Sequence, residues 1–385
     1  MSAKSAAELP ALTGLRGVLS LWVVFFHIYY ILEVVKFPTA DYLPAFIIHA
    51  VGIGGLGVDG FFLLSGFVLS HVYTRDLDRQ LTYESSRRFL LLRLARVYPV
   101  HLAIIIVYAL FKLSGVTFQM EMCGVPTLET DPNNTCQRFG LTGLVAQLTL
   151  TSIWGWHEPL TWNAPAWSIS AEWAAYLAFP LLVQVTSRVS NGWQAMMGAV
   201  VSVALLGLVL AARGSPADQI PVEDVSLARI GFLFVAGMLM YRCYQSELFA
   251  RIPWAVVAIV SLLLALLLLQ LRAYPIFFVW IFIPFILSLA QSGGIVSRFM
   301  SSRVMVWLGA VSYSLYMCHV LLLDLLGVFV KSDGAGEQID ALSALGLSCG
   351  LLAGSLALAS ALYYGVEEPC RRALRRFIER EPRRA

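Results

Sequence analysis

Long apolar blocks separated by short polar segments make up most of this chain. A helix needs about 20 predominantly apolar residues to cross a bilayer, and ten blocks meet that length approximately. The pattern therefore predicts an all-α polytopic membrane protein with about ten transmembrane helices. Their predicted ranges are 12–33, 50–73, 89–114, 165–187, 194–213, 227–244, 253–271, 273–291, 304–330 and 341–364. The block 141–153 is shorter, and we interpret it as an interfacial or re-entrant helix on the outer side.

The composition strengthens this prediction. Of the 385 residues, 58% are hydrophobic and only 13% are charged, and the mean hydropathy is +0.74. An average soluble domain has about 25% charged residues, so the composition excludes an ordinary soluble domain. The net charge of +3 is small and gives no indication of a nucleic-acid partner. The partner that the composition indicates is the lipid bilayer.

The distribution of positive charge predicts the orientation. With ten spans and a cytoplasmic N-terminus, the inner segments carry 17 Lys and Arg residues and the outer segments carry 5. Cytoplasmic loops are normally enriched in Lys and Arg, so we place both termini in the cytoplasm. A crossing at 141–153 would invert everything after it. We therefore predict a membrane domain over 1–370, with an outer loop at about 115–164, and a basic cytoplasmic tail over 371–385.

The predicted outer loop contains two of the six cysteines, Cys123 and Cys136. An outer-side disulfide between them is our prediction, with two free thiols as the alternative. The sequence contains no metal-ligand cluster that we can identify and no phosphate-binding glycine loop. The glycine-rich stretch GIGGLGVDG at 52–60 enters a predicted span, and close helix packing explains it better.

The first predicted helix carries two residues that are costly in hydrocarbon, Arg16 and His27. They are eleven residues apart, which places them on one helix face and about 16 Å apart along the axis. A cation near the inner mouth and a titratable imidazole deeper on the same wall indicate a channel for an extended anionic substrate. The alternative is a snorkelling arginine and a hydrogen-bonded packing histidine.

The third predicted helix begins in an arginine-rich segment. Arg93 and Arg96 are three residues apart and so face the same way. Arginine binds phosphate in a bidentate manner, and this cluster would suit the phosphates of a nucleotide-like cofactor. Contact with lipid headgroups is the alternative, although it explains the deeper Arg96 poorly.

Two carboxylates are predicted inside the membrane. Asp59, in the second helix, needs a partner, and either orients an imidazole such as His27 or pairs with an arginine. Glu172 enters the membrane among aromatic and hydroxyl residues that include Trp167 and Ser170. We interpret Glu172 as a candidate for binding or orienting a hydroxylated acceptor.

The ninth predicted helix contributes Tyr313 and His319 as candidate supporting residues. Tyr316 lies three residues before His319 and shares its face. His319 is equally well explained as a satisfied interior histidine. Asp324, in the same helix, is a further intramembrane acid to which we assign no role.

Six stretches, in order, resemble the motifs of the acyltransferase 3 family of integral-membrane acyltransferases. They are LTGLRGVLSLWVVFFH, GVDGFFLLSGFVLS, RLARVYPVHL, WSISAEWAAYLAFPLL, VSYSLYMCH and YYGVEEPCRRAL. The resemblance covers nearly the whole chain, which is similar to the stand-alone members of the family. One position departs from it, because the family often has a second acid after the glutamate and this chain has Trp173.

The resemblance implies transfer of an acyl group, often acetyl, from acyl-CoA to a hydroxyl of a cell-surface carbohydrate, a lipid or a small molecule. It implies that His27 is the catalytic base and that Arg16, Arg93 and Arg96 hold or position the anionic donor. Asp59 and Glu172 would then support the imidazole or bind the acceptor. The expected location is the bacterial cytoplasmic membrane, and succinyl is an open alternative to acetyl.

The chemistry leaves alternatives open. His27 either removes the acceptor's proton or itself carries the acyl group as a covalent intermediate. A multispan secondary transporter would also have many spans and buried ionisable groups, although we find no paired inverted halves. A catalytically silent membrane scaffold is a third and weaker hypothesis.

Overall fold

Helices form the secondary structure of the part of the chain that the computed structural model describes, and no strand occurs in that part. The described residues are 9–34, 37–79, 81–114, 139–156, 160–214, 225–246, 251–291, 293–332 and 339–380. Cys123 and Cys136, together with much of the predicted outer loop, lie outside these ranges.

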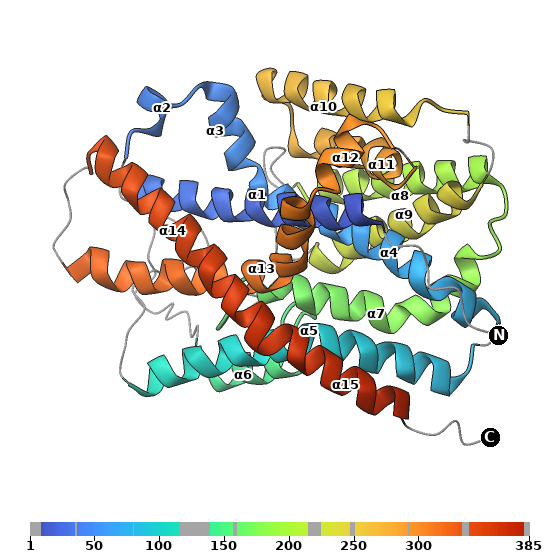
Figure 1. Ribbon diagram of the computed structural model, residues 1–385, viewed down its shortest axis with the longest axis horizontal. Coiled ribbons are helices and arrows are strands. Elements are labelled where there is room, and N and C mark those ends of the chain that lie inside the picture. The colour runs from blue at the N-terminus through green and yellow to red at the C-terminus, as the bar shows by residue number, and fades with distance from the viewer. Residues whose placement is uncertain are drawn as a thin grey trace.

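Most of the long helices lie side by side, with their axes close to one direction (Figure 1). The long helices are α1 (Pro10–Val34), α4 (Gly57–Arg79), α5 (Tyr83–Leu113), α7 (Ala166–Thr186), α8 (Gly192–Ala212), α9 (Ser226–Gln245), α10 (Trp254–Gln270), α11 (Pro275–Gln291), α13 (Arg303–Ser332) and α14 (Ala341–Leu362), and α14 runs obliquely to the others. Shorter helices connect or extend them. These are α2 (Thr39–Tyr42), α3 (Ala45–Gly52), α6 (Leu141–Leu148), α12 (Ile295–Met300) and α15 (Glu368–Arg380), with a 3-10 turn at Gly54–Leu56 and a π-helical turn at Tyr363–Glu367.

Each of the ten predicted spans corresponds to one long helix. Among the described residues, 8 helices are long and apolar enough to cross a membrane. The other two, α10 and α11, are apolar helices of 17 residues each, which is the short end of the range for a spanning helix. The predicted class, an all-α polytopic membrane protein, is confirmed.

The second predicted span begins later than the apolar pattern indicates. We predict a start near residue 50, but α3 ends at Gly52 and α4 begins at Gly57. Glycine is about 1 kcal/mol less favourable than alanine inside a helix, and four glycines between 52 and 57 break the helix here. Close packing is confirmed for Gly54 and Gly57, because a Cβ on either would lie 2.6 Å from a main-chain oxygen of α1, that of Trp22 or of Leu19. A Cβ on Gly52 or Gly55 would meet nothing within 4 Å.

The main chains of α1 and α13 touch. A Cβ on Gly17 would lie 2.8 Å from the main-chain nitrogen of Gly309, and a Cβ on Gly309 would lie 1.9 Å from the main-chain oxygen of Thr13. Small residues at a helix interface allow this approach in membrane proteins, where helix association depends on van der Waals contact. The two glycines therefore set the distance between α1 and α13.

The direction of α13 relative to α1 limits the number of crossings. Gly17 contacts Gly309 and His27 contacts His319, so the two helices run in the same direction. An odd number of crossings must then lie between them, and the seven predicted spans satisfy this condition. An eighth crossing at α6 would reverse α13, and α6 has only 8 residues, far fewer than a bilayer requires.

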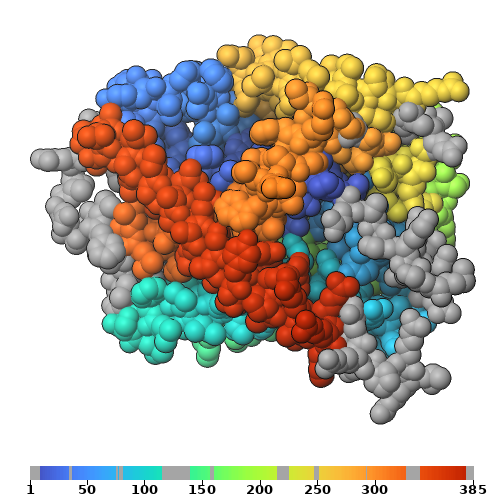
Figure 2. Space-filling view, viewed as in Figure 1, coloured from blue at the N-terminus to red at the C-terminus, as the bar shows by residue number. Residues whose placement is uncertain are grey.

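The C-terminal segment is helical beyond the last predicted span. α14 continues through the π-helical turn into α15, which packs on α5. Figure 2 shows α14 and α15 as a continuous red band across the face of the molecule. The predicted basic tail, 371–385, is thus helical as far as Arg380, and 381–385 lie outside the described residues.

We predict that Gly309→Ala lowers the thermal unfolding midpoint of the detergent-solubilised protein. The added Cβ cannot fit 1.9 Å from the oxygen of Thr13, so α1 and α13 must separate, and overpacking of this kind costs about 1–3 kcal/mol or more. The matched control is Gly231→Ala in α9, where a Cβ meets nothing within 4 Å. Equal midpoints for the two variants would contradict the packing constraint.

Candidate active site

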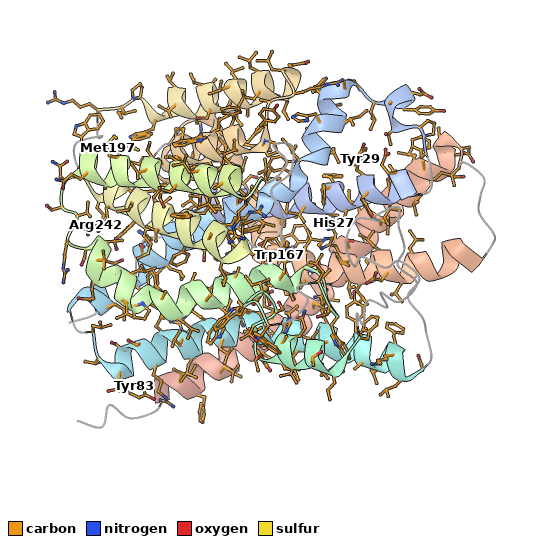
Figure 3. All side chains as sticks on the ribbon, turned by 180° about the vertical axis from the view of Figure 1, so that it is seen from behind. His27, Tyr29, Tyr83, Trp167, Met197 and Arg242 are labelled. Atoms are coloured by element: carbon orange, nitrogen blue, oxygen red, sulfur yellow. The ribbon has the colours of Figure 1, made fainter. Side chains whose placement is uncertain are left out.

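Two histidines from different helices meet in the middle part of the bundle. Nδ1 of His27 in α1 lies 3.3 Å from Nε2 of His319 in α13, and their ring centroids are 4.7 Å apart. His319 is buried and His27 is half-buried. Figure 3 shows His27 well inside the length of α1 and away from its ends. The glycine contact ten residues earlier in each helix fixes this meeting.

Main-chain oxygens assign the protons of this histidine pair. Nδ1 of His27 lies 2.8 Å from the oxygen of Val23, and Nδ1 of His319 lies 2.8 Å from the oxygen of Tyr316. A carbonyl oxygen only accepts, so each neutral ring carries its proton on Nδ1. Nε2 of His319 is then an acceptor facing the Nδ1–H of His27. The basic nitrogen of His27 is Nε2.

The pair also limits how much charge it can hold. If both rings were protonated, the Nε2–H of His319 would point at the Nδ1–H of His27 across 3.3 Å. Two like charges at that distance repel strongly in a medium of low dielectric constant. The histidine pair therefore takes up one proton rather than two.

A cavity of about 160 Å³ lies among α1, α4, α5, α7 and α13. It brings together five of the predicted site residues from four separate helices. These are Arg16, Arg93, Arg96, Glu172 and Tyr313. Its lining has three arginines against one carboxylate, so it favours an anion. We call it the inner cavity.

Polar neighbours hold the side chains around the inner cavity. Ser65 donates a hydrogen bond of 2.7 Å to Oε1 of Glu172. Arg93 donates from Nη2 to the hydroxyl of Tyr73 at 2.7 Å, and its guanidinium also lies over the Tyr73 ring. Tyr313 donates to the main-chain oxygen of Val97. These contacts fix the geometry before any ligand enters.

The inner cavity approaches the histidine pair through Tyr316. Ser168 donates a 2.8 Å hydrogen bond to the Tyr316 hydroxyl, and both residues line the cavity. The ring centroid of Tyr316 is 5.9 Å from that of His319. Sequence reasoning placed Tyr316 on the face of His319 but assigned it no role, and it did not single out Ser168.

Glu367 is a site residue that sequence reasoning missed. It lies in the π-helical turn and is buried, and its Oε2 accepts a 2.7 Å hydrogen bond from Ser314. Its Oε1 has no hydrogen-bond partner among the described residues. Its charge acts on both Arg16 and Arg96. The signal available in the sequence was an acid at the end of the last apolar block. The structure adds that this acid lies in a π-helical turn, and such turns are frequent at functional sites.

Asp59 pairs with an arginine and not with His27. The Nε and Nη2 atoms of Arg229 donate to its two carboxylate oxygens at 2.6 and 2.5 Å. Both side chains are buried, with 3% of Arg229 and none of Asp59 exposed. Of the two alternatives that the sequence leaves open, the structure has the arginine pair. Arg229 was missed, although it is an arginine inside a predicted span.

Trp167 and Ser170 lie beside the inner cavity and do not line it. The Arg229 guanidinium lies 5.5 Å from the centroid of the Trp167 ring, so Trp167 completes the Asp59–Arg229 unit. The Oγ of Ser170 accepts from the main-chain nitrogen of Ile153 at 3.3 Å. Its neighbour two residues earlier, Ser168, is the serine that faces the cavity.

A bundle of apolar helices around a histidine pair and an arginine-lined cavity defines an integral-membrane protein that can handle a proton and an anionic substrate. The chain belongs to the acyltransferase 3 family, whose acyltransferase domain matches residues 9–364. The predicted family is confirmed.

Two curated proteins are similar to this chain. An acyltransferase named MdmB from Streptomyces mycarofaciens is 29% identical over 96% of this chain and 93% of its own length. Protein 2 in the picA locus of Rhizobium radiobacter is 29% identical over 46% of this chain and 80% of its own length. No solved structure matches the chain.

These findings define the protein as a membrane acyltransferase. Its activity requires a bilayer that holds the helices and an acceptor for the acyl group. Between the predicted enzyme and the alternative transporter, family membership supports the enzyme.

We predict that Asp59→Asn destabilises the protein by about 3–5 kcal/mol, because it leaves Arg229 buried without its counter-charge. The double variant Asp59→Leu/Arg229→Met removes both charges and should unfold closer to the wild type. Denaturant unfolding in detergent measures all three proteins. A single variant as stable as the wild type would show that this pair is not a structural unit.

Proposed function

We propose that this protein moves an acyl group from acyl-CoA to a hydroxyl of a cell-surface carbohydrate or a related acceptor. Acetyl is the acyl group that we propose first, and the bacterial cytoplasmic membrane is the proposed location. The observation that carries the proposal is the His27–His319 pair beside the arginine-lined inner cavity. A base and a cation-rich cavity are what an anionic thioester and a hydroxyl acceptor require.

In the proposed reaction His27 is the general base. Its Nε2 takes the proton of the acceptor hydroxyl while the hydroxyl oxygen forms a bond to the thioester carbonyl carbon. The carbon–sulfur bond then breaks, the sulfur leaves as the thiolate of coenzyme A, and the thiolate takes up the proton that His27 removed from the acceptor. General-base catalysis by a positioned side chain contributes about 10² to 10⁴-fold.

The arginines of the inner cavity hold the donor in this proposal. Arg16, Arg93 and Arg96 come from α1 and α5, and no hydrogen bond ties Arg16 or Arg96 to another residue in the described ranges. Their donors are therefore available to an anionic ligand. The charges of Glu172 and Glu367 act on Arg16 and Arg96 and limit the excess positive charge. Glu172 also lines the cavity, where it can accept a hydrogen bond from a hydroxylated acceptor.

His319 is a positioning residue in this mechanism. Its Nε2 accepts a hydrogen bond from the Nδ1–H of His27. This bond keeps the proton of His27 on Nδ1 and leaves Nε2 free to act on the acyl acceptor. A covalent acyl-histidine at Nε2 of His27 is the rival mechanism, and it would need the same tautomer. The position of His319 therefore serves both versions of the chemistry.

We predict that His27→Ala abolishes acyl transfer and leaves coenzyme A binding within about twofold. The base is lost, whereas the cavity arginines remain. Purified protein is incubated with radiolabelled acetyl-CoA and envelope glycans, and label in the glycans is counted. His49→Gln is the control, because His49 is bonded to Ala273 at another interface. Full transfer by a folded His27→Ala protein would exclude the base assignment.

We predict that His319→Leu lowers kcat by about 10²-fold, because the His27 ring loses the acceptor that fixes its orientation. The KM for acetyl-CoA should stay within about twofold. His319→Gln keeps a side-chain acceptor at a similar reach and should recover part of the activity. A purely structural role predicts equal losses for Leu and Gln, with a lowered unfolding midpoint in both.

A further inference from the structure

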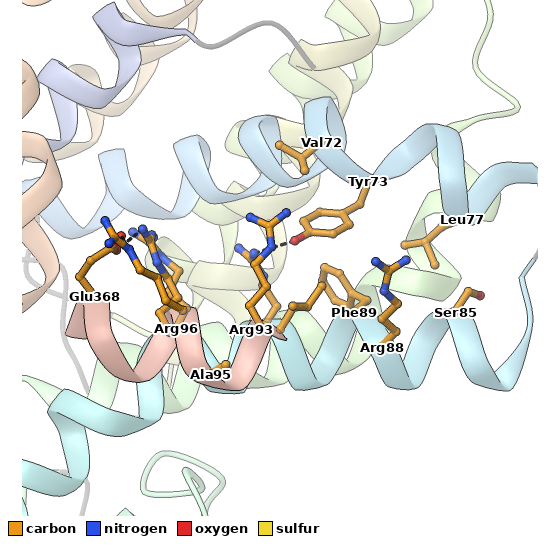
Figure 4. Close-up of a pocket in the computed structure, with 14 residues that line it drawn as sticks. Val72, Tyr73, Leu77, Ser85, Arg88, Phe89, Arg93, Ala95, Arg96 and Glu368 are labelled. Atoms are coloured by element: carbon orange, nitrogen blue, oxygen red, sulfur yellow. Dashed lines mark hydrogen bonds and ion pairs between the residues drawn. The ribbon is translucent and has the colours of Figure 1, made fainter. Parts of the chain in front are cut away.

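A second and larger cavity, of about 580 Å³, lies between α4, α5 and α15. Six of its lining residues are arginines, and the described lining contains one carboxylate, Glu368. Figure 4 shows Arg88, Arg93 and Arg96 along α5, with Glu368 of α15 beside Arg96. The arginines are Arg88, Arg93, Arg96, Arg371, Arg372 and Arg375. We call it the outer cavity, and this name does not refer to the outer side of the membrane.

The outer cavity is arranged to receive a polyanion. Glu368 accepts hydrogen bonds from Arg371 and Arg372 and so orients the first turn of α15. The lining still has an excess of five positive charges. The buried Nε of Arg93 has no partner among the described residues. Arginines that converge on one space attract anions, and phosphate is the anion that their planar donors fit best.

The outer and inner cavities meet at two arginines. Arg93 and Arg96 line both spaces, so the larger cavity lies next to the smaller one at α5. The turn that joins α14 to α15 ends in Glu367, whose charge acts on Arg96. α15 is therefore tied to the same side chains that border the reaction site.

The two cavities differ in the same way as the two ends of coenzyme A. One end of that molecule is a bulky nucleotide with a 3′-phosphate and a 5′-diphosphate, and the other is a thin pantetheine arm that ends in sulfur. The outer cavity, at about 580 Å³, has the size of a pocket for a compact ligand, which is about 300–1,000 Å³. The inner cavity, at about 160 Å³, is large enough only for a narrow arm.

We propose that α15 completes a binding site for the phosphates of the donor's nucleotide, with Arg371 and Arg375 as ligands that the transmembrane bundle alone does not supply. This inference rests on the proposed function, because it takes acyl-CoA as the donor. The basic C-terminal segment is then part of the substrate site, and its charges do more than orient the chain in the membrane.

Phosphate esters also occur in anionic lipid headgroups, and the geometry favours the nucleotide as their source here. Two of the six arginines, Arg93 and Arg96, also line the inner cavity. A lipid phosphate at the bilayer surface would not need arginines that border both spaces. The experiment therefore contains one arm for each source.

The test compares Arg371→Gln/Arg375→Gln with the control Arg376→Gln in full-length protein in phosphatidylcholine nanodiscs. Arg376 is on the same helix, is exposed and does not line the cavity. The dissociation constant is measured for coenzyme A and for 3′-dephospho-coenzyme A. We expect the double variant to bind coenzyme A about 100-fold more weakly, roughly tenfold per arginine, while the control matches the wild type.

Turnover separates this inference from the proposed function. The double variant should lose kcat/KM with acetyl-CoA but retain it with S-acetyl-pantetheine, which has no nucleotide. Wild-type protein that transfers acetyl from neither thioester contradicts the proposed function itself. Wild-type turnover with acetyl-CoA that the double variant preserves overturns only the role of α15.

The lipid arm uses nanodiscs that contain phosphatidylglycerol. If the double variant retains less phosphatidylglycerol through detergent extraction and binds coenzyme A as the wild type does, the arginines bind lipid and the inference is overturned. Weaker coenzyme A binding with unchanged lipid retention supports it.

Discussion

The contact between Gly17 of α1 and Gly309 of α13 is the constraint on which the site depends. Membrane helices gain little from hydrophobic association in lipid, so their spacing is set by how closely side chains allow them to pack. Here two main chains touch, and ten residues further along each helix the histidines meet at 3.3 Å. Because each offset is ten residues, the two helices have the same rise between the contacts. A larger residue at either glycine would separate the pair that we propose for catalysis.

Charge inside the bundle is organised in two ways that serve different purposes. Asp59 and Arg229 satisfy each other at 2.5–2.6 Å, and so form a closed structural unit beside Trp167. Arg16 and Arg96 instead share the charges of Glu172 and Glu367. Arg16 lines the inner cavity, and Arg93 and Arg96 line both cavities. A buried pair with complete hydrogen bonds has no capacity left for a ligand, whereas an excess of arginine donors does. The location of that excess is what separates binding residues from structural ones.

The helices and the class of protein are predictable from the sequence, because apolar block length follows directly from bilayer thickness. The spacing of Arg16 and His27 is also predictable, since both are on one helix. The residues on other helices that contact these side chains were not predictable. Arg229 finds Asp59 across 170 positions of sequence, and His319 finds His27 across 292. Such pairs depend on which helices pack together, and single-helix periodicity contains no information about that.

The remaining question of mechanism, base or acyl carrier, turns on the free nitrogen of His27. Its Nδ1 is bonded to the oxygen of Val23 and faces Nε2 of His319, so only Nε2 can accept a proton or an acyl group. An acyl group at Nε2 would make the ring cationic while Nδ1–H remained bonded to two acceptors, which stabilises that cation. A proton at Nε2 has the same effect on the ring. The histidine pair therefore supports a positively charged His27 in either mechanism, and its second member must stay neutral for that support to exist.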